Sequence, residues 1–480
     1  MTAFTGLDLV VLLAYLGGVT VWGAWLGRNQ KGGTDYFLGS RSLPWLAVML
    51  SVVATETSTL TFLSIPGVAY TGSLVFLQLT LGYLAGRILV SLVLLPAYYR
   101  GSLTTAYELL ERRFGLGMRR FTSGIFMVTR LLADSVRLFA TAIPLALITG
   151  WPYPASIAVI GVLTLVYTYA GGIKAVVWVD ALQMGLYLLG AVATLVAIQV
   201  LVPGGWSEVL AASAAADKMR TIDLSFDLST TYTLWAGVFG GAVFTMASHG
   251  TDQLIVQRLL TCRDLRSSQK ALVGSGVVVI GQFLLFLLVG LGLWAFYEGR
   301  AFESSDEIFA LFIVEQLPPG ITGLLIAGVF AAAMSSLSSS INSLASAAAY
   351  DYWAPMVGAR DDDARLLRAG RAFSLLWAVL LIVGATLFIP LSRETAAVEV
   401  ALGIASLVYG GLLGAFALGV LTRRPGQAAA IIGVASGIGV VTLLRDQMAW
   451  PWYAVVGSTI TLIVGSAIGR VAPRSEAAES

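Results

Sequence analysis

Apolar stretches of twenty or more residues recur along this 480-residue chain, and they constrain its fold more than any other feature. A stretch of that length matches one helical crossing of a bilayer. Only helices and closed barrels satisfy their backbone groups in hydrocarbon, and these runs are too long and continuous for barrel strands. Since 57% of the residues are hydrophobic and 12% are charged, the sequence predicts an all-α integral membrane protein.

The apolar runs predict about thirteen transmembrane helices in a single domain over 1–480. Their expected ranges are 6–27, 44–70, 74–98, 118–148, 153–170, 174–202, 234–260, 265–297, 320–350, 366–391, 397–421, 425–444 and 451–470. With the N-terminus outside, the inner loops and tail, Arg258 included, hold 21 of the 29 Lys and Arg residues, the outer loops 5 and the helices 3. We therefore expect a multi-pass protein of the cell membrane with a cytoplasmic C-terminus.

Composition also excludes several classes of function. The single cysteine, Cys262, and the single histidine, His249, exclude an intramolecular disulfide and any metal cluster built on several of these residues. The net charge of +2 says nothing about partners, but the sequence has no footprint of nucleic-acid binding, so we expect no nucleic-acid partner. We expect lipid, ions and small solutes as partners and no enzymatic activity, and the oligomeric state stays open.

Two of the expected helices are interrupted by polar residues at mid-membrane. The first, Ser51–Gly67, has a centre rich in threonine, and the second is interrupted at Ala247–Gln253. Either alone is compatible with a kinked helix. Two interruptions at matching positions indicate an inverted-repeat secondary transporter, whose substrate and ions bind near the midplane. The repeats would cover 44–202 and 234–421, with peripheral helices at 6–27, 425–444 and 451–470.

The stretch Phe330–Asp351 is a membrane-length helix with serines along one face, among them Ser335, Ser336, Ser339 and Ser343. A hydroxyl in hydrocarbon needs a partner, so this face must meet another helix, a cavity or an ion. Taken alone, the pattern favours close packing of small residues.

Several ionisable residues fall inside the expected spans, where each needs a partner or an aqueous path. Asp134 and Arg137 stand three residues apart and are expected to pair with each other. Asp180 has no obvious partner apart from a possible interfacial role near Lys174. Glu56 would either bind a cationic group or bond Arg137.

Six motifs together resemble the sodium/solute symporter family. They are YFLGSRSLPW from Tyr36, ATETSTLTFLSIPG from Ala54, TAYELLERRFG from Thr105, YAGGIKAVVWVDALQ from Tyr169, TDQLIVQR from Thr251 and AAAMSSLSSSINS from Ala331. The resemblance implies sodium-coupled symport of a small organic solute. It also implies a leucine-transporter-type core of two inverted five-helix repeats (5+5), with one extra N-terminal and two extra C-terminal helices.

The same resemblance implies a set of site residues. The main sodium site would use carbonyls of Ala54, Thr57 and Ala332 with hydroxyls of Ser335 and Ser336. A possible second sodium site would use Asp180, Ser338 and Ser339. The substrate would lie among Ser58, Thr61, Phe76, Gln78, Arg137, Asp252 and Gln253. We expect a carboxylate or amino-acid-like solute, and the alternatives are proton coupling through Asp180 or Glu56, and sodium-coupled sugar transport.

Overall fold

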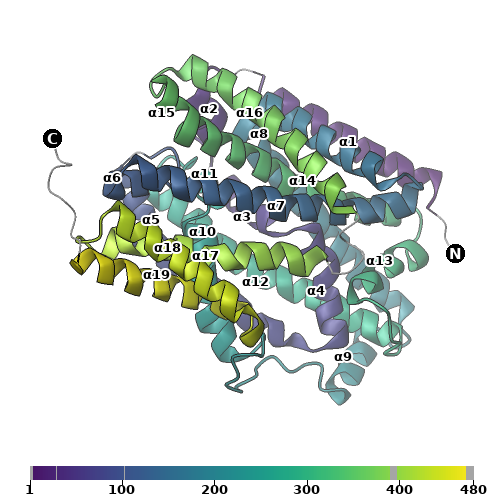
Figure 1. Cartoon of the computed structure of the whole chain (residues 1–480). Coiled ribbons are helices and arrows are strands. Elements are labelled where there is room, and N and C mark those ends of the chain that lie inside the picture. Colours follow the sequence, from purple (N-terminus) through teal and green to yellow (C-terminus); the bar gives the residue numbers. More distant parts are fainter. Residues whose placement is uncertain (1–3, 29, 102, 390–396, 472–480) are drawn as a thin grey trace.

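The computed structural model describes residues 4–28, 30–101, 103–389 and 397–471 of the chain. Long helices run alongside one another in a single bundle (Figure 1). The helices of the first part are α1 (Gly6–Leu26), α2 (Gly33–Leu38), α3 (Trp45–Glu56), α4 (Thr59–Thr71), α5 (Leu77–Arg100), α6 (Glu108–Phe114), α7 (Leu116–Thr149), α8 (Tyr153–Leu201) and α9 (Gly205–Ala215). Those of the second part are α10 (Gly241–Gly250), α11 (Gln253–Leu259), α12 (Leu265–Phe296), α13 (Ser305–Gln316), α14 (Ile321–Ala347), α15 (Ala354–Val357), α16 (Asp363–Phe388), α17 (Ala397–Leu421), α18 (Gln427–Leu444) and α19 (Pro451–Val471).

Each expected membrane helix overlaps an observed one. Within the described ranges, eight helices are long and apolar enough to cross a membrane, or nine when the bent pair α3 and α4 counts as one span. The number thirteen therefore stays a prediction, and so does the division into repeats at 44–202 and 234–421. The short helices α2, α6 and α15 lie at one end of the bundle, here called the α6 end, and α9 and α13 lie at the other, the α9 end (Figure 1).

The two expected helices 153–170 and 174–202 form α8, which is bent at Gly172. Gly172 has φ +52° and ψ −153°, a conformation that residues with a side chain rarely adopt. A Cβ at this position would also lie 2.5 Å from the carbonyl oxygen of Tyr36. The bend therefore requires glycine, and it directs the second half of α8, which carries Asp180, into the bundle.

The span Ile321–Val357, which contains the serine-rich helix α14, is the most enclosed of the candidate membrane spans. In its apolar stretch of 18 residues, 89% of the residues are buried. Its apolar face, which the sequence assigns to lipid or to apolar neighbours, is covered by protein: Met334, Leu337 and Ile341 are all buried. In contrast, only 22% of the residues in the corresponding apolar stretch of the peripheral helix α16 are buried. The hydroxyls of α14 therefore lie in the centre of the protein.

Candidate ion and substrate site

The first broken helix has its break at Thr57 and Ser58, between α3 and α4. The two halves, Trp45–Glu56 and Thr61–Thr71, are bent by 62°. Thr57 has extended backbone angles, and the Ser58 hydroxyl caps α4 by accepting from the backbone N–H of Thr61 at 3.3 Å. The last carbonyls of α3 lack helical partners and carry the negative end of its dipole. The break therefore offers neutral oxygens in the middle of the bundle.

The serine helix α14 contacts both halves of this break. On the α3 side, the hydroxyls of Thr55 and Ser339 lie 3.1 Å apart. On the α4 side, the Thr59 hydroxyl donates to the carbonyl of Val329 at 3.2 Å. The segment of α14 between these two contacts is buried throughout. It is therefore held beside the break.

The five residues predicted for the main sodium site lie on these two segments: Ala54, Thr57, Ala332, Ser335 and Ser336. The Ser336 hydroxyl donates to the Ala332 carbonyl at 3.2 Å, and the Thr57 hydroxyl accepts from Gln282 at 2.6 Å. Neutral oxygens of this kind are the ligands that a hard cation such as sodium prefers. Among the described residues, no three Asp, Glu, His or Cys side chains form a group that could hold a metal ion. The ligand set stays a prediction.

The predicted second sodium site contains a cation of the protein itself. Asp180 is fully buried, and its carboxylate accepts from Ser51 at 2.7 Å, from Ser335 at 2.8 Å and from the Arg258 guanidinium at 3.1 Å. The expectation that Asp180 lacks a partner is therefore wrong. The sequence counts Arg258 with the inner loops, but α11 carries it inward, where it is fully buried.

The two serines predicted for that site differ in their contacts. Ser339 accepts a hydrogen bond from Arg258 and donates to the Ser335 carbonyl at 2.6 Å. Ser338 donates to the same carbonyl at 3.0 Å. Lys174, the alternative partner of Asp180, pairs at 2.5 Å with Asp35 of α2, a helix outside the membrane spans. Burial would raise the pKa of the Asp35 carboxyl, but Lys174 lowers it below its usual range.

The second broken helix has its break at Thr251 and Asp252, between α10 and α11. Asp252 caps α11 by accepting from the backbone N–H of Leu254 at 2.9 Å. The same carboxylate pairs with Arg130, and both residues bond the Tyr409 hydroxyl, at 3.0 Å from Asp252 and 2.8 Å from Arg130. A buried ion pair therefore fills this break.

A cavity of about 290 Å³ lies between the two breaks. Four of the predicted substrate residues line it: Ser58, Thr61, Phe76 and Arg137. Its polar lining also includes Glu56, Arg130, Ser248, His249 and Tyr409, so the ion pair of the second break borders this cavity, and its apolar walls include Ile65, Tyr83, Phe244, Phe283 and Trp450. A volume of this size and mixed lining suit a small organic solute.

The other three predicted substrate residues do not line this cavity, because each is bonded to protein elsewhere. Asp252 belongs to the ion pair in the second break. Gln78 accepts from the backbone N–H of Asp223 at 2.9 Å and so binds the loop after α9. Gln253 accepts from the backbone N–H of Ala106 at 2.8 Å, toward the α6 end.

The sequence predicts only some of the ion pairs near the cavity. Arg137 bonds Asp134 at 3.1 Å, as expected. Glu56 pairs with Arg87 and not with Arg137, and Nε2 of His249 lies 3.6 Å from its Oε2. A second, small cavity of about 20 Å³, lined by Ser58, Asp134, Arg137 and Ser336 among others, has room for about one water molecule. Arg137 thus borders both the large cavity and the neighbourhood of the predicted sodium ligands.

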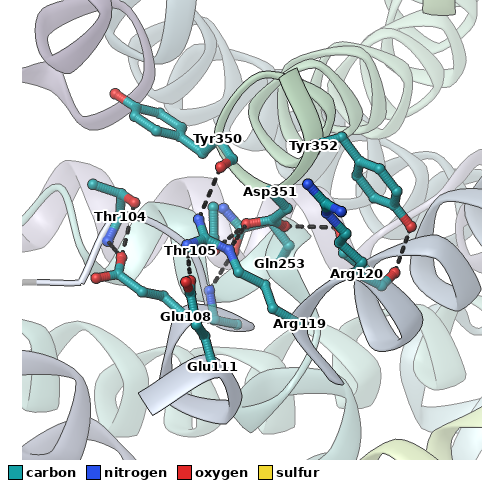
Figure 2. Close-up of polar contacts among 12 residues, drawn as sticks. Thr104, Thr105, Glu108, Glu111, Arg119, Arg120, Gln253, Tyr350, Asp351 and Tyr352 are labelled. Carbon is teal, nitrogen blue, oxygen red and sulfur yellow. Dashed lines mark hydrogen bonds and ion pairs between the residues drawn. The ribbon is translucent and has the colours of Figure 1, made fainter. Parts of the chain in front are cut away.

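The α6 end is held by a separate buried cluster around Asp351, which follows the serine helix (Figure 2). Asp351 accepts from Thr105 at 2.6 Å, from Ser123 at 2.7 Å and from Arg119 at 2.7 Å. Arg119 also pairs with Glu111 at 2.5 Å. These bonds join α6 and α7 to the end of α14. No motif in the sequence suggests the partners of Asp351, because they come from distant parts of the chain.

The family model of the sodium:solute symporter family matches residues 36–437. This chain belongs to that family. NanT, a sodium/sialic acid symporter of Aliivibrio fischeri, is 31% identical over 473 residues, covering 96% of this chain and 93% of the relative. SiaT, a sodium/sialic acid symporter of Proteus mirabilis, is 30% identical and covers 96% of this chain and 95% of the relative.

Solved structures agree with this membership. A substrate-bound, outward-open Na⁺-coupled sialic acid symporter aligns with a TM-score of 0.89 and 29% identity, covering 98% of this chain and 100% of that one. A nucleobase-cation-symport-1 family transporter aligns with a TM-score of 0.61 and 14% identity, over 92% of this chain and 96% of that one, and shows the shared fold. This symporter family member is therefore a multi-pass, sodium-coupled transporter of small solutes with the expected inverted-repeat core, and not an enzyme.

Proposed function

We propose that this symporter imports a small organic carboxylate together with sodium by alternating access. The observation that carries the proposal is the position of Arg137, which lines the cavity with Ser58 and Thr61 at the N-terminal end of α4. A guanidinium, two hydroxyls and a helix N-terminus all favour an anion, and arginine binds a carboxylate through two parallel hydrogen bonds. One nitrogen of Arg137 bonds Asp134, which leaves other donors for a ligand.

The charge around the cavity supports a solute with one negative charge. Three neutral pairs surround it: Glu56 with Arg87, Asp252 with Arg130, and Asp134 with Arg137. The main sodium ion beside the break adds a positive charge that a monocarboxylate in the cavity balances, whereas the second ion would bind at Asp180, which does not line the cavity. An uncompensated charge inside a protein costs several kcal/mol, so an anion suits this site better than a neutral sugar.

For the coupling ions, the proposal keeps both predicted sites. The main site uses Ala54, Thr57, Ala332, Ser335 and Ser336, and the second uses Asp180, Ser338 and Ser339. Arg258 bonds the same carboxylate as the second ion would, so we expect the second ion to bind more weakly than the first. The distribution of positive charge supports a cell-membrane protein with its N-terminus outside and its C-terminus in the cytoplasm.

Sialic acid is the first solute to test, because it is a carboxylate and two relatives that match over nearly their whole length are sodium/sialic acid symporters. Thermal unfolding of the purified protein would be measured in sodium and in potassium, and then with sialic acid, short monocarboxylates, amino acids and sugars. We expect sodium to raise the melting temperature and a carboxylate to raise it further only in sodium. Uptake into proteoliposomes would then be measured for the solutes that bind.

The matched variants are Arg137→Lys and, as a control, Arg445→Lys at an exposed position outside the cavity. Lysine keeps the charge but loses the two-pronged geometry, so Arg137→Lys should weaken carboxylate binding about tenfold or more, while sodium binding without solute stays as in the wild type. A sugar or a neutral solute as the best ligand contradicts the proposal. Uptake that needs an acid gradient and ignores sodium favours proton coupling instead.

A further inference from the structure

A second polar group of the cavity, Glu56, plays no part in the proposed binding of sodium or carboxylate. It is the last residue of α3, it lines the cavity two residues before Ser58, and its side chain is 21% exposed. Its Oε2 bonds the fully buried guanidinium of Arg87. Its Oε1 has no hydrogen-bond partner among the described residues. One carboxylate oxygen is therefore fixed, and the other is available to a ligand.

The neighbours of Glu56 hold this acceptor in place. The Arg87 guanidinium also lies 3.1 Å from Nε2 of His249, and Nδ1 of the same ring lies 2.9 Å from the Ser248 hydroxyl. The Nε and Nη1 groups of Arg87 have no partner in the described part of the chain. The charge of Arg87 therefore remains directed at Glu56, and the pair is neutral.

The free oxygen of Glu56 needs a hydrogen-bond donor from the solute: a hydroxyl, an amide N–H or an ammonium group. The net charge of the site distinguishes the charged ammonium group from the two neutral donors. Sodium and a carboxylate already neutralise each other beside three neutral pairs. An ammonium group would add an unbalanced positive charge, whereas a hydroxyl or an amide adds none.

Glu56 also limits where the donor stands on the solute. Its Cα and that of Ser58 are two residues apart, and two residues span at most about 7 Å. A solute whose carboxylate bonds Ser58 and Arg137 therefore presents the donor within a few bonds of that carboxylate. The aromatic residues Phe76, Phe283 and Trp450 line the same cavity and would face the rest of such a solute.

We infer that Glu56 is a specificity-determining residue that accepts from a hydroxyl or amide N–H of the solute, which makes the substrate a hydroxylated or N-acylated monocarboxylate and not a zwitterionic amino acid. This inference rests on the proposed import of a carboxylate. It adds to that proposal the chemistry of the group beside the carboxylate.

The test compares four solutes by titration calorimetry of the purified protein in sodium. Gluconate, hexanoate and norleucine share a six-carbon carboxylate and differ in carrying hydroxyls, no further polar group or an amine; N-acetylneuraminate is a larger hydroxylated and N-acylated carboxylate. We expect the wild type to bind gluconate or N-acetylneuraminate at least about tenfold more tightly than hexanoate or norleucine.

The variant Glu56→Gln keeps the shape but loses the charge of the acceptor. Because hydrogen bonds to charged groups are about twice as strong, we expect affinity for the hydroxylated solutes to fall about tenfold and affinity for hexanoate to stay within threefold. Glu56→Gln with Arg87→Gln removes both charges and serves if the single variant does not fold. Stabilisation by sodium alone reports that the variants are folded.

Two outcomes overturn the inference and leave the proposed function standing: tighter binding of norleucine than of either hydroxylated acid by the wild type, or an equal loss of affinity for every carboxylate in Glu56→Gln. Binding of no carboxylate at all, with sodium still stabilising the protein, overturns the proposed function and the inference together.

Discussion

The two broken helices look alike in the sequence, but the groups at their breaks are bonded differently in the structure. The break between α3 and α4 exposes neutral carbonyls and hydroxyls next to the serine helix. In the break between α10 and α11, the carboxylate of Asp252 is already paired with Arg130 and bonded to Tyr409. The first break still has oxygens to offer an ion or solute, and the second has its charge satisfied by the protein.

This difference indicates that the two matching breaks have different roles, one in ligand binding and the other in stability. At the first break, the neighbouring carboxylate of Glu56 is already paired with Arg87, so backbone carbonyls and hydroxyls are the groups left for a mobile cation. A break with an internal ion pair is fixed, and removal of one partner leaves a buried charge alone. We therefore expect variants at the first break to change ligand binding and variants at the second break to change stability.

The largest effect is expected at the second break. Arg130→Met leaves Asp252 buried without its counter-ion, which should cost about 3–5 kcal/mol of stability and lower the melting temperature in sodium-free buffer. The double variant Arg130→Met with Asp252→Asn removes both charges and keeps a residue that caps helices well, so most of the loss should be recovered. If Arg130→Met melts like the wild type, the ion pair does not hold the second break together.

Sodium itself should have the next largest effect, and only the first break should matter for it. At a sodium concentration one hundred times its dissociation constant, binding adds about 2.7 kcal/mol to stability. The double variant at Arg130 and Asp252 should keep this increment, measured as the shift in melting temperature between sodium and potassium. Loss of the increment in that variant would mean that the second break also contributes to ion binding.

A single hydroxyl at the first break should have a smaller effect. Ser336 and Ser343 lie on the same helix, and each donates to a carbonyl of that helix at 3.2 Å. Changing either to alanine removes the same kind of bond, but only Ser336 is a predicted sodium ligand. We expect Ser336→Ala to weaken sodium binding about tenfold and Ser343→Ala to leave it unchanged, as measured by sodium titration of the melting temperature. Equal losses in both variants would make the serines of α14 packing residues only.

The positions of both breaks could be read from the sequence, because polar residues in the middle of an apolar span are costly in lipid and typical of an interrupted helix. What fills each break could not. Arg87, Arg130 and Arg258 stand far along the chain from the carboxylates that they bond. A helical pattern gives the position of such a residue along its own helix, but not the neighbouring helix that its long side chain reaches.

The same limit explains the substrate residues that the sequence misplaces. In the sequence, Gln78 and Gln253 stand close to residues that line the cavity, and the side chain of each could bind a solute. In the structure their side chains bond backbone N–H groups of Asp223 and Ala106. Partners of this kind belong to loops and connecting segments, whose paths the hydrophobic pattern does not determine. Ser58, Thr61 and Arg137 do line the cavity.

The smallest effect, expected for Ser338→Ala, tests whether the division between the breaks is complete. Arg258, which α11 brings from the second broken helix, bonds Asp180 beside the first. A second sodium ion must therefore compete with it, and should alter the steepness of the sodium dependence more than its midpoint. Ser338 donates to the Ser335 carbonyl of its own helix at 3.0 Å, a bond of the same kind as that of Ser343. If the second ion binds, Ser338→Ala should lower the Hill coefficient for sodium-driven uptake from above one toward one. The number of sodium ions carried per solute should fall with it. Ser343→Ala should change neither value. An unchanged coefficient and flux ratio would mean that Arg258 takes the place of that ion, and that the second break supplies a permanent cation to the first.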